Sequence, residues 1–435
     1  MPLIFDVLII GAGPAGISTA LKLARSGLKI AIFDKEVFPR EKTCGDGLTL
    51  DVINQLSDVS ESLNEAFKQF PKKQESHEAM LFSPDFSRMR IPFRHKQQSQ
   101  PFYTCRRIDL DHLMFLQLKQ HENISVFENC KVQKIEIQDE RVLLSANDSL
   151  FEGNMLVGAD GANSMFFRSM RMNRIQKEHQ AVGLTCYYSG IEPLNQNNPI
   201  EIYFLKDILP GYLWIFHLPG GTANVGIGML ASVTAKQKIN LKQKFEDLLA
   251  ADTFKSRFLN AKREGLVKGH TLPLGFDKRI ISGKRFLLAG DAASLIDPFT
   301  GEGVGNAIRS GRVAADHIAD CFMKNDFSAD FNKKYDNEIY RRLLPEYKMN
   351  HAIRNLCRFP WLLNYVFGAV DRYPELEKKL NLAFFELQSN TVQSKIVFIY
   401  KTLAIFSFQR LFVSIFGKRR TKEFLFGNVI NINIF

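Results

Sequence analysis

The sequence predicts an α/β protein in which a parallel sheet is interrupted by a mostly antiparallel β-sheet block and followed by a helical C-terminal region. Three observations support this prediction. An apolar run at 3–10 leads into a glycine-rich turn and then an apolar stretch with helical periodicity. Residues 180–270 form a series of β-type runs, and residues 326–435 have a helical pattern. The chain of 435 residues should hold two or three domains, because about 100 to 200 residues is usual for one.

The first turn has the spacing of a dinucleotide-binding loop, G-x-G-x-x-G, beginning at Gly11. Gly11 allows a tight turn, Gly13 lets the backbone approach a pyrophosphate, and Gly16 lets helix and strand pack closely. The phosphates would then lie at the positive end of the helix dipole. The next apolar run ends in Asp34, whose carboxylate would accept hydrogen bonds from ribose hydroxyls and favours a free 2′-hydroxyl over a 2′-phosphate. This part of the chain therefore suits FAD or NAD and argues against NADP.

A second glycine-bearing turn follows the apolar run at 286–289. There Gly290 precedes Asp291, whose carboxylate can accept hydrogen bonds from ribityl hydroxyls at the end of a buried strand. The glycine-rich run at 297–306 then opens a helix predicted at 305–319, and its N–H groups would face the electron-rich N1/O2 edge of a flavin. Together the two turns fit the two ends of one FAD.

Helix and strand patterns alternate between the two turns. We expect a hairpin at 78–93, a helix at 109–120, a return to the nucleotide sheet at 154–161 and a helix near 240–250. The other strands expected here are 124–127, 132–137, 141–144, 181–188, 200–205, 212–218 and 223–230. Breaks in the C-terminal helical region are expected at Pro345, Pro360 and Pro374.

These elements predict a discontinuous domain organisation. The expected domains are an FAD-binding domain at 1–75, 105–178 and 272–325, a substrate-binding β-sheet domain at 76–104 and 179–271, and a helical C-terminal region at 326–435. No second G-x-G-x-x-G occurs between residues 140 and 280, so the reductant has no nucleotide domain of its own. NAD(P)H that docks transiently, ferredoxin and a quinol all remain open as electron donors.

The composition is that of a globular protein, with 45% hydrophobic and 24% charged residues. The net charge of +11 is not accompanied by a nucleic-acid-binding motif, so no nucleic acid partner is expected. The first strand begins almost at Met1, without a basic region or a cleavage site before it, which predicts a cytoplasmic protein. The six cysteines are scattered, without C-x-x-C or paired histidines at ligand spacing, so neither a disulfide framework nor a metal site is expected.

A C-terminal stretch has features of a membrane-binding helix. Read as a helix, 396–416 places apolar residues on one stripe, but Lys401 and Arg410 interrupt the run. A helix that lies in the interface or packs on the protein is therefore favoured over a spanning one. The basic residues at 418–420 would strengthen contact with an anionic lipid surface. Peripheral contact with the inner face of the membrane and a helix buried against the catalytic domain both remain open.

Further motifs resemble one class of flavoproteins. The features that stand in the order found in the class built like p-hydroxybenzoate hydroxylase are the Gly11 turn, R-x-x-L-D from Arg107, the Asp160-Gly161 pair and the Gly290-Asp291 pair. Within that class, P-x-x-x-x-C-G-x-G at 39–47 and Y-x-W-x-F at 212–216 resemble the geranylgeranyl reductase family. The resemblance covers about residues 3–325, and His217 stands where the family motif has proline.

The resemblance implies a Rossmann-like domain that holds FAD non-covalently. It also implies an enzyme that hydrogenates isolated double bonds of a prenyl lipid or another hydrophobic isoprenoid. Reduced FAD would deliver hydride to one alkene carbon, and a proton would come from Cys44, a bound water or the flavin itself. Arg40 and Lys42 flank Cys44, a setting that favours a reactive thiol, although Cys44 could instead be a small residue that fills a tight loop. Tyr212 and Trp214 alternate on a predicted strand and so face one side of the second sheet, where they either line the substrate cavity or form an aromatic core.

The expected site residues fall into two groups. Those with expected catalytic roles are Cys44, Tyr212 and Trp214. Those expected to contact the cofactor are Gly11, Gly13, Pro14, Ala15, Gly16, Asp34, Lys35, Arg40, Cys44, Gly45, Arg107, Asp160, Gly161, Gly290, Asp291, Pro298, Gly301, Gly303, Gly305 and Asn306.

Two other functions use the same fold and remain open. One is an FAD-dependent aromatic monooxygenase, with halogenation ranked lower because the tryptophan motif of halogenases is only partly matched at 212–216. The other is a membrane-associated flavoprotein that only transfers electrons to a partner.

Overall fold

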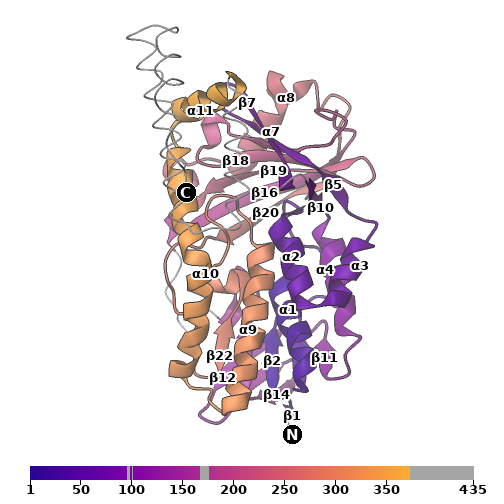
Figure 1. Ribbon diagram of the computed structural model, residues 1–435, viewed down its shortest axis with the longest axis vertical. Helices are drawn as coiled ribbons and strands as arrows, with labels where there is room; N and C mark the ends of the chain where they lie inside the picture. Colours follow the sequence, from indigo (N-terminus) through magenta and orange to yellow (C-terminus); the bar gives the residue numbers. More distant parts are fainter. Residues whose placement is uncertain (96–97, 100, 167–175, 373–435) are drawn as a thin grey trace. The chain divides into compact units, whose positions relative to one another are not determined.

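The computed structural model describes residues 1–95, 98–99, 101–166 and 176–372, and Figure 1 shows its elements. The chain divides into a unit at Met1–Phe367 and a second unit that begins at Gly368. The packing and the site discussed below lie in the first unit. The expected membrane-binding stretch at 396–420 and the expected break at Pro374 lie outside the described residues.

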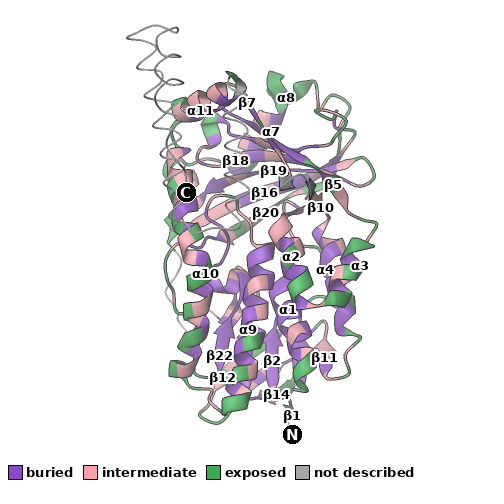
Figure 2. Ribbon diagram, in the orientation of Figure 1, coloured by how far each residue is buried: buried purple, intermediate pink, exposed green. Residues whose placement is uncertain are grey.

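A six-stranded sheet forms the centre of the nucleotide-binding part. Its strands, in order across the sheet, are β11 (Ile124–Phe127), β3 (Ile30–Phe33), β2 (Val7–Ile10), β15 (Met155–Gly158), β22 (Phe286–Leu288) and β21 (Ser282–Gly283). All neighbours pair in parallel except β21, which is antiparallel to β22. The strands β2, β3, β15 and β22 are buried along their whole length (Figure 2), as expected for a parallel sheet that is covered on both faces.

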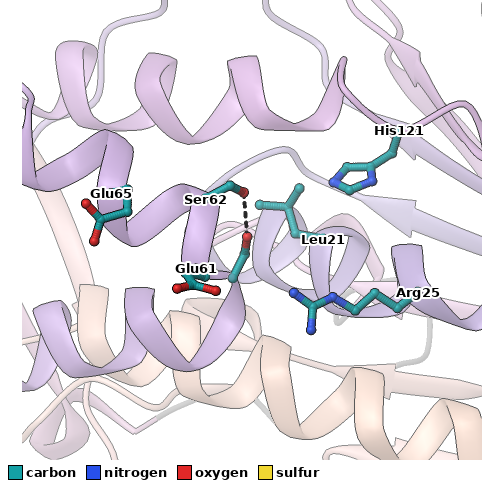
Figure 3. A pocket seen from close by; sticks show the side chains of 7 residues that line it. Leu21, Arg25, Glu61, Ser62, Glu65 and His121 are labelled. Carbon is teal, nitrogen blue, oxygen red and sulfur yellow. Dashed lines mark hydrogen bonds between the residues drawn. The ribbon is translucent and has the colours of Figure 1, made fainter.

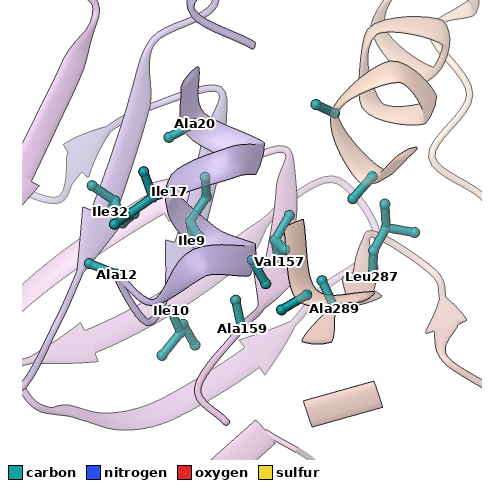
Figure 4. Close-up of a cluster of buried hydrophobic side chains, with 14 of the residues drawn as sticks. Ile9, Ile10, Ala12, Ile17, Ala20, Ile32, Val157, Ala159, Leu287 and Ala289 are labelled. Atoms are coloured by element: carbon teal, nitrogen blue, oxygen red, sulfur yellow. The ribbon is translucent and has the colours of Figure 1, made fainter. Parts of the chain in front are cut away.

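Helices cover one face of this sheet, and a small sheet covers the other. The helical layer consists of α1 (Pro14–Leu23), α9 (Val304–Lys324), α4 (Arg107–Leu118), α2 (Leu50–Val59) and α3 (Glu61–Lys68). The small sheet has the order β1 (Leu3–Ile4), β14 (Ser149–Gly153), β13 (Val142–Ala146) and β12 (Val132–Ile137). Phe33 and Phe151 join the two sheets, with ring centroids 4.7 Å apart. On the helical side, Ile9, Ile17 and Val157 lie in the shared apolar core drawn in Figure 4.

The second large sheet has seven strands and is built from two distant parts of the sequence. Its order is β20 (Lys262–Pro273), β16 (Gln180–Ser189), β19 (Thr222–Leu230), β18 (Tyr212–Leu218), β17 (Ile200–Tyr203), β6 (Glu78–Phe82) and β7 (Arg88–Pro92). All neighbours are antiparallel except β17 and β6, so the hairpin expected at 78–93 joins the sheet through a parallel pair. One face is covered by α7 (Leu241–Ala250) and α8 (Asp252–Lys255), which contribute Phe245 and Phe254 to its apolar core.

Shorter elements complete the described chain. A three-stranded sheet has the order β4 (Gly47–Leu48), β10 (Phe102–Thr104) and β5 (Gln74–Ser76), and a two-stranded sheet pairs β8 (Arg94–His95) with β9 (Gln98–Ser99). The remaining helices are η1 (Ala24–Ser26), η2 (Lys177–His179), η3 (Lys206–Ile208), α6 (Ala231–Gln237), η4 (Gly290–Ala293), α10 (Ala329–Leu356) and α11 (Pro360–Arg372). Among the helices of the described residues, none has both the length and the apolar character that crossing a bilayer requires.

The helix α10 runs through Pro345, so the break expected there is wrong. A proline removes one helical hydrogen bond and crowds the preceding turn. Buried residues on both sides of it, Leu343 and Tyr347, belong to the core of the nucleotide-binding part, and this packing offsets the cost of the proline. The Tyr347 hydroxyl also donates to the carbonyl oxygen of Leu295 at 2.7 Å. The break expected at Pro360 is present, since Pro360 begins α11.

Candidate functional site

The turn between β2 and α1 places its three glycines in different surroundings. A Cβ atom on Gly11, whose φ is +99°, would lie 2.3 Å from the carbonyl oxygen of Ala159, and a Cβ on Gly16 would lie 1.9 Å from the carbonyl oxygen of Gly11. Both glycines are therefore required because backbone packs on backbone. Gly13 differs, since the atom nearest to its Cβ position is Nη2 of Arg40, at 3.5 Å. The N-terminus of α1 thus has the Arg40 guanidinium at ordinary contact distance beside Gly13, which suits a pyrophosphate.

Asp34 follows the end of β3 and supports this turn. Its Oδ2 accepts a hydrogen bond from the backbone N–H of Ala12 at 2.9 Å, and its Oδ1 accepts a second backbone N–H at 3.0 Å. Each oxygen retains a lone pair that a ribose hydroxyl could use. Arg40 lies between two carboxylates, with Nε 3.9 Å from Asp34 and Nη2 3.3 Å from Asp111. Lys35 is exposed and pairs with a surface glutamate, so the structure does not bring it together with Arg40.

The second turn meets the first through Gly290. Pro14 begins α1, and the methyl group of Ala15 lies 3.1 Å from the position of a Cβ on Gly290, whose φ is +62°. Asp291 follows in η4 and is half-buried. Within the described part of the chain its carboxylate accepts no hydrogen bond, although a carboxylate in such a position needs donors. The ribityl hydroxyls of FAD would supply them, so these residues fit that cofactor.

The loop at 297–303 leads into the N-terminus of α9. Asp297 holds its shape, because Oδ1 accepts hydrogen bonds from the backbone N–H of Thr300 at 2.8 Å and from its hydroxyl at 3.0 Å. The carbonyl oxygen of Pro298 accepts from an arginine of α10 at 3.1 Å. Asn306 donates through Nδ2 to a backbone carbonyl in the preceding segment at 2.9 Å. Pro298 and Asn306 therefore act on the backbone of this loop, and they fix where its N–H groups lie.

The glycines of this loop are closely surrounded at the start of α9. Gly301 has a φ of +71°, Gly303 is the N-cap of α9, and a Cβ on Gly305 would lie 2.5 Å from Oε1 of Glu302. Burial and the neighbouring Asp51 raise the pKa of Glu302 to about 8. The raised pKa favours the neutral carboxylic acid, which weakens the negative charge at the helix N-terminus. The helix start can then face an anionic edge of a ligand.

The Asp160-Gly161 pair lies at the end of β15, next to the glycine turn. Oδ2 of Asp160 accepts a hydrogen bond from the N–H of Met165 at 2.6 Å, whereas Oδ1 is buried and has no hydrogen-bond partner among the described residues. Burial raises the pKa of this carboxyl group. No atom lies within 4 Å of a Cβ position on Gly161, whose φ is +77°. The Asp160 carboxylate therefore fixes the backbone of the turn that follows it, and the position beside Gly161 is open.

Three basic side chains, those of Arg107, Lys42 and His270, belong to the region of Cys44 and the second turn. Cys44 is half-buried, and the other five cysteines are buried. Arg107 is buried, pairs with an aspartate of its own helix at 2.7 Å and interacts electrostatically with Cys44. Burial lowers the pKa of Lys42, which interacts electrostatically with Asp291, Arg107 and Cys44. Burial and Lys42 also lower the pKa of His270, whose Nε2 has no hydrogen-bond partner in the described part of the chain.

Asp46 ties the Cys44 loop, residues 39–47, to the seven-stranded sheet. This carboxylate is fully buried, and its residue has a φ of +64°. Oδ2 accepts hydrogen bonds from the Tyr187 hydroxyl at 2.7 Å and from Nδ2 of Asn224 at 2.8 Å, and Oδ1 accepts from the backbone N–H of Arg107 at 3.0 Å. Burial raises the pKa of Asp46 to about 6, and the three hydrogen bonds oppose the rise.

The face of the seven-stranded sheet that meets these loops carries an aromatic row, Tyr212, Trp214 and Phe216. All three are half-buried, and successive ring centroids are 6.0 and 6.3 Å apart. The Tyr212 hydroxyl donates to the carbonyl oxygen of Thr300, and a Cβ on Gly45 would lie 3.4 Å from Nε1 of Trp214. The aromatic row therefore contacts both the 297–303 loop and the Cys44 loop.

Two glycines continue this face and leave it bare. In the strand register, Gly228 lies opposite Tyr212 and Gly183, and Gly183 lies opposite His270. Residues opposite one another in antiparallel strands share a face, so His270 and Tyr212 stand on either side of the two glycines. The nearest atoms to a Cβ on Gly183 or Gly228 are 3.8 Å away. We call these two residues the glycine floor, since a flat ligand can lie on them.

His217 lies on the opposite face of β18. Its Nε2 is 3.4 Å from Oε1 of Glu201, a buried carboxylate that also pairs with Arg257. The residue that replaces the family's proline is therefore a partner in a structural ion cluster. It does not join Cys44 and the aromatic row.

A separate hollow lies away from this site. Figure 3 shows this hollow near the C-terminal part of α1. Its lining residues are Leu21, Arg25, Ser60, Glu61, Ser62, Glu65 and His121. The glycine turn is at the other end of α1, so the hollow contributes nothing to the site. No group of three His, Cys, Asp or Glu side chains within the described ranges is arranged to hold a metal ion.

Comparison with known proteins places this geometry among redox enzymes. A family model for pyridine nucleotide-disulphide oxidoreductases matches residues 5–181. The chain is 29% identical to a digeranylgeranylglycerophospholipid reductase of Thermoplasma acidophilum, over 78% of this chain and 84% of the relative. It is 26% identical to a menaquinone reductase of Mycobacterium tuberculosis, over 72% of this chain and 76% of the relative.

Solved structures share the fold. A geranylgeranyl bacteriochlorophyll reductase-like protein of Thermoplasma acidophilum superimposes with a TM-score of 0.75 at 22% identity, covering 88% of this chain and 96% of that one. A flavin-dependent halogenase gives a TM-score of 0.67 at 19% identity, covering 79% and 63%. The expected fold class, a Rossmann-like nucleotide-binding domain with an inserted β-sheet domain and a helical C-terminal region, is confirmed.

The geometry adds residues that the sequence reasoning did not single out. They are Asp46, His270, Glu302 and Asn224. Asp46 lies inside the recognised 39–47 segment, so the motif could have drawn attention to it. His270 and Asn224 carry no such signal, because their position depends on strand register across the sheet.

The Gly13→Asp variant should fold but lose FAD. The new side chain has room in the protein itself, yet it places a negative charge where the pyrophosphate would lie. We expect FAD occupancy, measured by absorbance after purification, to fall by more than about tenfold with unchanged far-UV circular dichroism. Val37→Asp, which adds the same charge at an exposed position, is the control and should retain FAD. Full occupancy in Gly13→Asp would refute the assignment of this turn.

The buried Asp46 should give stability an unusual pH dependence. Because its pKa is raised to about 6, its contribution to stability is fully present below the unfolded value near 3.8 and is lost as the pH rises through about 6. The free energy of unfolding of the wild type relative to Asp46→Asn should thus fall by on the order of 3 kcal/mol between about pH 4 and pH 7. Chemical denaturation at several pH values measures this.

The control for this measurement is Asp85→Asn. Asp85 is exposed, and the Ser83 hydroxyl lowers its pKa, so its contribution is present at higher pH and lost on acidification. The wild type should therefore gain stability relative to Asp85→Asn as the pH rises. If the wild type gained stability with rising pH relative to both variants, a raised pKa at Asp46 would be contradicted.

Proposed function

We propose that this chain, an FAD-dependent oxidoreductase, hydrogenates isolated carbon–carbon double bonds of a prenyl lipid of the geranylgeranyl type. The observation that carries the proposal is the surface formed by the aromatic row and the glycine floor, which meets the Cys44 loop and the 297–303 loop. This surface is apolar and flat, and it lies beside the groups that fit FAD. The similarity to a digeranylgeranylglycerophospholipid reductase over most of both chains also supports it.

The residues that we assign to FAD act at its two ends. At the pyrophosphate end are Gly11, Gly13, Pro14, Ala15, Gly16, Asp34, Arg40, Asp160 and Gly161, with Lys35 at the surface beside them. At the flavin end are Cys44, Gly45, Arg107, Gly290, Asp291, Pro298, Gly301, Gly303, Gly305 and Asn306. This division follows from the contact between the two turns and from the unpaired carboxylate oxygens.

When bound and reduced, FAD supplies a hydride to one carbon of the double bond. The chain must then hold a proton for the other carbon, so that one H₂ equivalent is added in total. The Cys44 thiol is the group we assign to this role, because it is half-buried next to the aromatic row and interacts electrostatically with Arg107. Tyr212 and Trp214 would orient the prenyl chain and exclude water from the reacting carbons.

The electron donor belongs to the proposal as well. NAD(P)H, ferredoxin and a quinol each deliver electrons to a flavin, and the chain carries no second G-x-G-x-x-G that would select a nicotinamide. Two other activities are the alternatives that an assay must separate. An aromatic monooxygenase would add oxygen to its substrate, and an electron-transfer flavoprotein would oxidise the donor without changing a lipid.

Incubation with geranylgeranyl lipids should reveal the reaction. We expect the dithionite-reduced, FAD-loaded protein to add hydrogen in pairs to the prenyl chain, seen by mass spectrometry as mass increases of two hydrogens per reduced bond. Protein without FAD is the control. Products that carry one added oxygen would indicate the monooxygenase, and donor oxidation with an unchanged lipid would indicate electron transfer only.

Filling the glycine floor should separate lipid turnover from cofactor binding. A valine at Gly183 has room for its Cβ, because the nearest atom is 3.8 Å away, but it would occupy the surface between His270 and Tyr212. We expect Gly183→Val to keep FAD and to lower prenyl reduction by more than about tenfold. Ser189→Val, on the same strand and face but about 20 Å away, is the matched control. Equal turnover in both variants would remove the glycine floor from the substrate path.

A further inference from the structure

We infer that Asn224 is a positioning residue that couples Trp214 on the substrate surface to the Cys44 loop. The inference rests on the proposed function for the identity of the substrate, but its geometry does not. Asn224 lies on β19, on the face that carries the aromatic row, and its side chain is fully buried. No motif marks this residue, since an asparagine within a strand has no signature of its own.

All four hydrogen-bonding positions of the Asn224 amide are used. Nδ2 donates to the carbonyl oxygen of Cys44 at 2.8 Å and to Oδ2 of Asp46 at 2.8 Å. Oδ1 accepts from Nε1 of Trp214 at 2.9 Å and from the Thr185 hydroxyl at 2.5 Å. One orientation of the amide satisfies this set, because a flipped amide would set its NH₂ group against the Trp214 N–H and its oxygen against two acceptors.

The two sides of this amide belong to different parts of the site. The donor side holds the Cys44 loop, where the positive φ of Asp46 shows a backbone that is not held by regular secondary structure. The acceptor side holds the indole of Trp214, whose only polar atom is Nε1. That indole lies over Gly226, where a Cβ would be 2.2 Å from a ring carbon. A shift of the indole would therefore strain its hydrogen bond to Asn224, and a movement of Asn224 would in turn displace the backbone of Cys44.

Arg107 completes the constraint from the other side of the loop. Its backbone N–H donates to Asp46 at 3.0 Å, and its buried guanidinium interacts electrostatically with Cys44. The loop is thus held at the carbonyl oxygen of Cys44 by Asn224, and at the carboxylate of Asp46 by both Asn224 and Arg107. Removal of Asn224 releases the carbonyl oxygen of Cys44 and leaves the buried carboxylate of Asp46 with one donor fewer.

Two substitutions separate the two sides. Asn224→Asp keeps an acceptor for Trp214 but loses the donor to Cys44 and places a second acidic group beside Asp46. Asn224→Ala loses both sides. Each is made in a Trp361→Phe background, because the chain has two tryptophans and this change leaves Trp214 as the only emitter.

The readouts do not depend on lipid turnover. Cys44 is the one half-buried cysteine, so its rate of modification by a disulfide reagent reports on the loop, with Cys44→Ala as the blank. We expect that rate to rise by about tenfold in both variants, the factor that corresponds to the loss of one hydrogen bond to the loop. The emission maximum of Trp214 should move in Asn224→Ala and stay near the wild type in Asn224→Asp.

Tyr203→Phe is the matched control, since it deletes a buried hydrogen bond to Glu201 in the same sheet, away from Cys44. It should lower the melting temperature by a similar amount without changing either readout. If Cys44 reactivity in both folded, FAD-loaded Asn224 variants stays within about twofold of Tyr203→Phe, the role of Asn224 is only structural and the inference is wrong.

A measurement on the Trp361→Phe protein with its native Asn224 covers the case in which the variants do not fold. Adding a geranylgeranyl lipid should change Trp214 emission and Cys44 reactivity over the same concentration range. A change in emission with unaltered Cys44 reactivity would overturn the coupling while leaving lipid binding intact. The absence of both changes would refute the coupling, and the product assay would then decide separately whether the proposed function holds.

Discussion

Close contact between backbones that lack side chains is the constraint on which the site depends. Gly16 packs on Gly11, Gly11 packs on Ala159 of β15, and a Cβ on Gly311 of α9 would lie 2.2 Å from the carbonyl oxygen of Ala15. These contacts draw α1, β15 and α9 together at one edge of the parallel sheet. The edge is where the carboxyl ends of parallel strands meet, which is the usual ligand side of such sheets. This packing brings the residues that follow β2, β15 and β22 to the same edge.

The second constraint is the joint between the parallel sheet and the seven-stranded sheet. Tyr212 reaches Thr300, Trp214 lies near Gly45, and Asp46 is buried against the sheet. A buried carboxylate is costly unless donors surround it, and three donors do so here. The loop that carries Cys44 is therefore specified by polar contacts to strands that are distant in sequence. A site built in this way can tolerate an apolar ligand, since its polar groups satisfy one another.

The sequence predicted those features that depend on short spacing along the chain. The glycine turn, Asp34 and the Gly290-Asp291 turn follow local rules of backbone geometry, and the structure brings them together. The strand at 149–153 was not predicted, and α10 passes through Pro345 because tertiary packing outweighs the local preference of proline. Asn224 and His270 could not be found from the sequence, because only the register of β16, β19 and β20 reveals which residues share a face.

The electrostatics of the site centre on Lys42. This lysine forms no ion pair with any carboxylate of the described residues, and burial lowers its pKa. The carboxylate of Asp111 is already paired with Arg107, and burial together with Asp51 raises the pKa of Glu302. Asp291 raises the pKa of both Lys42 and His270. A negatively charged group that enters beside Lys42 would favour its charged form in the same way, and the buried ammonium group would stabilise that group without rearrangement.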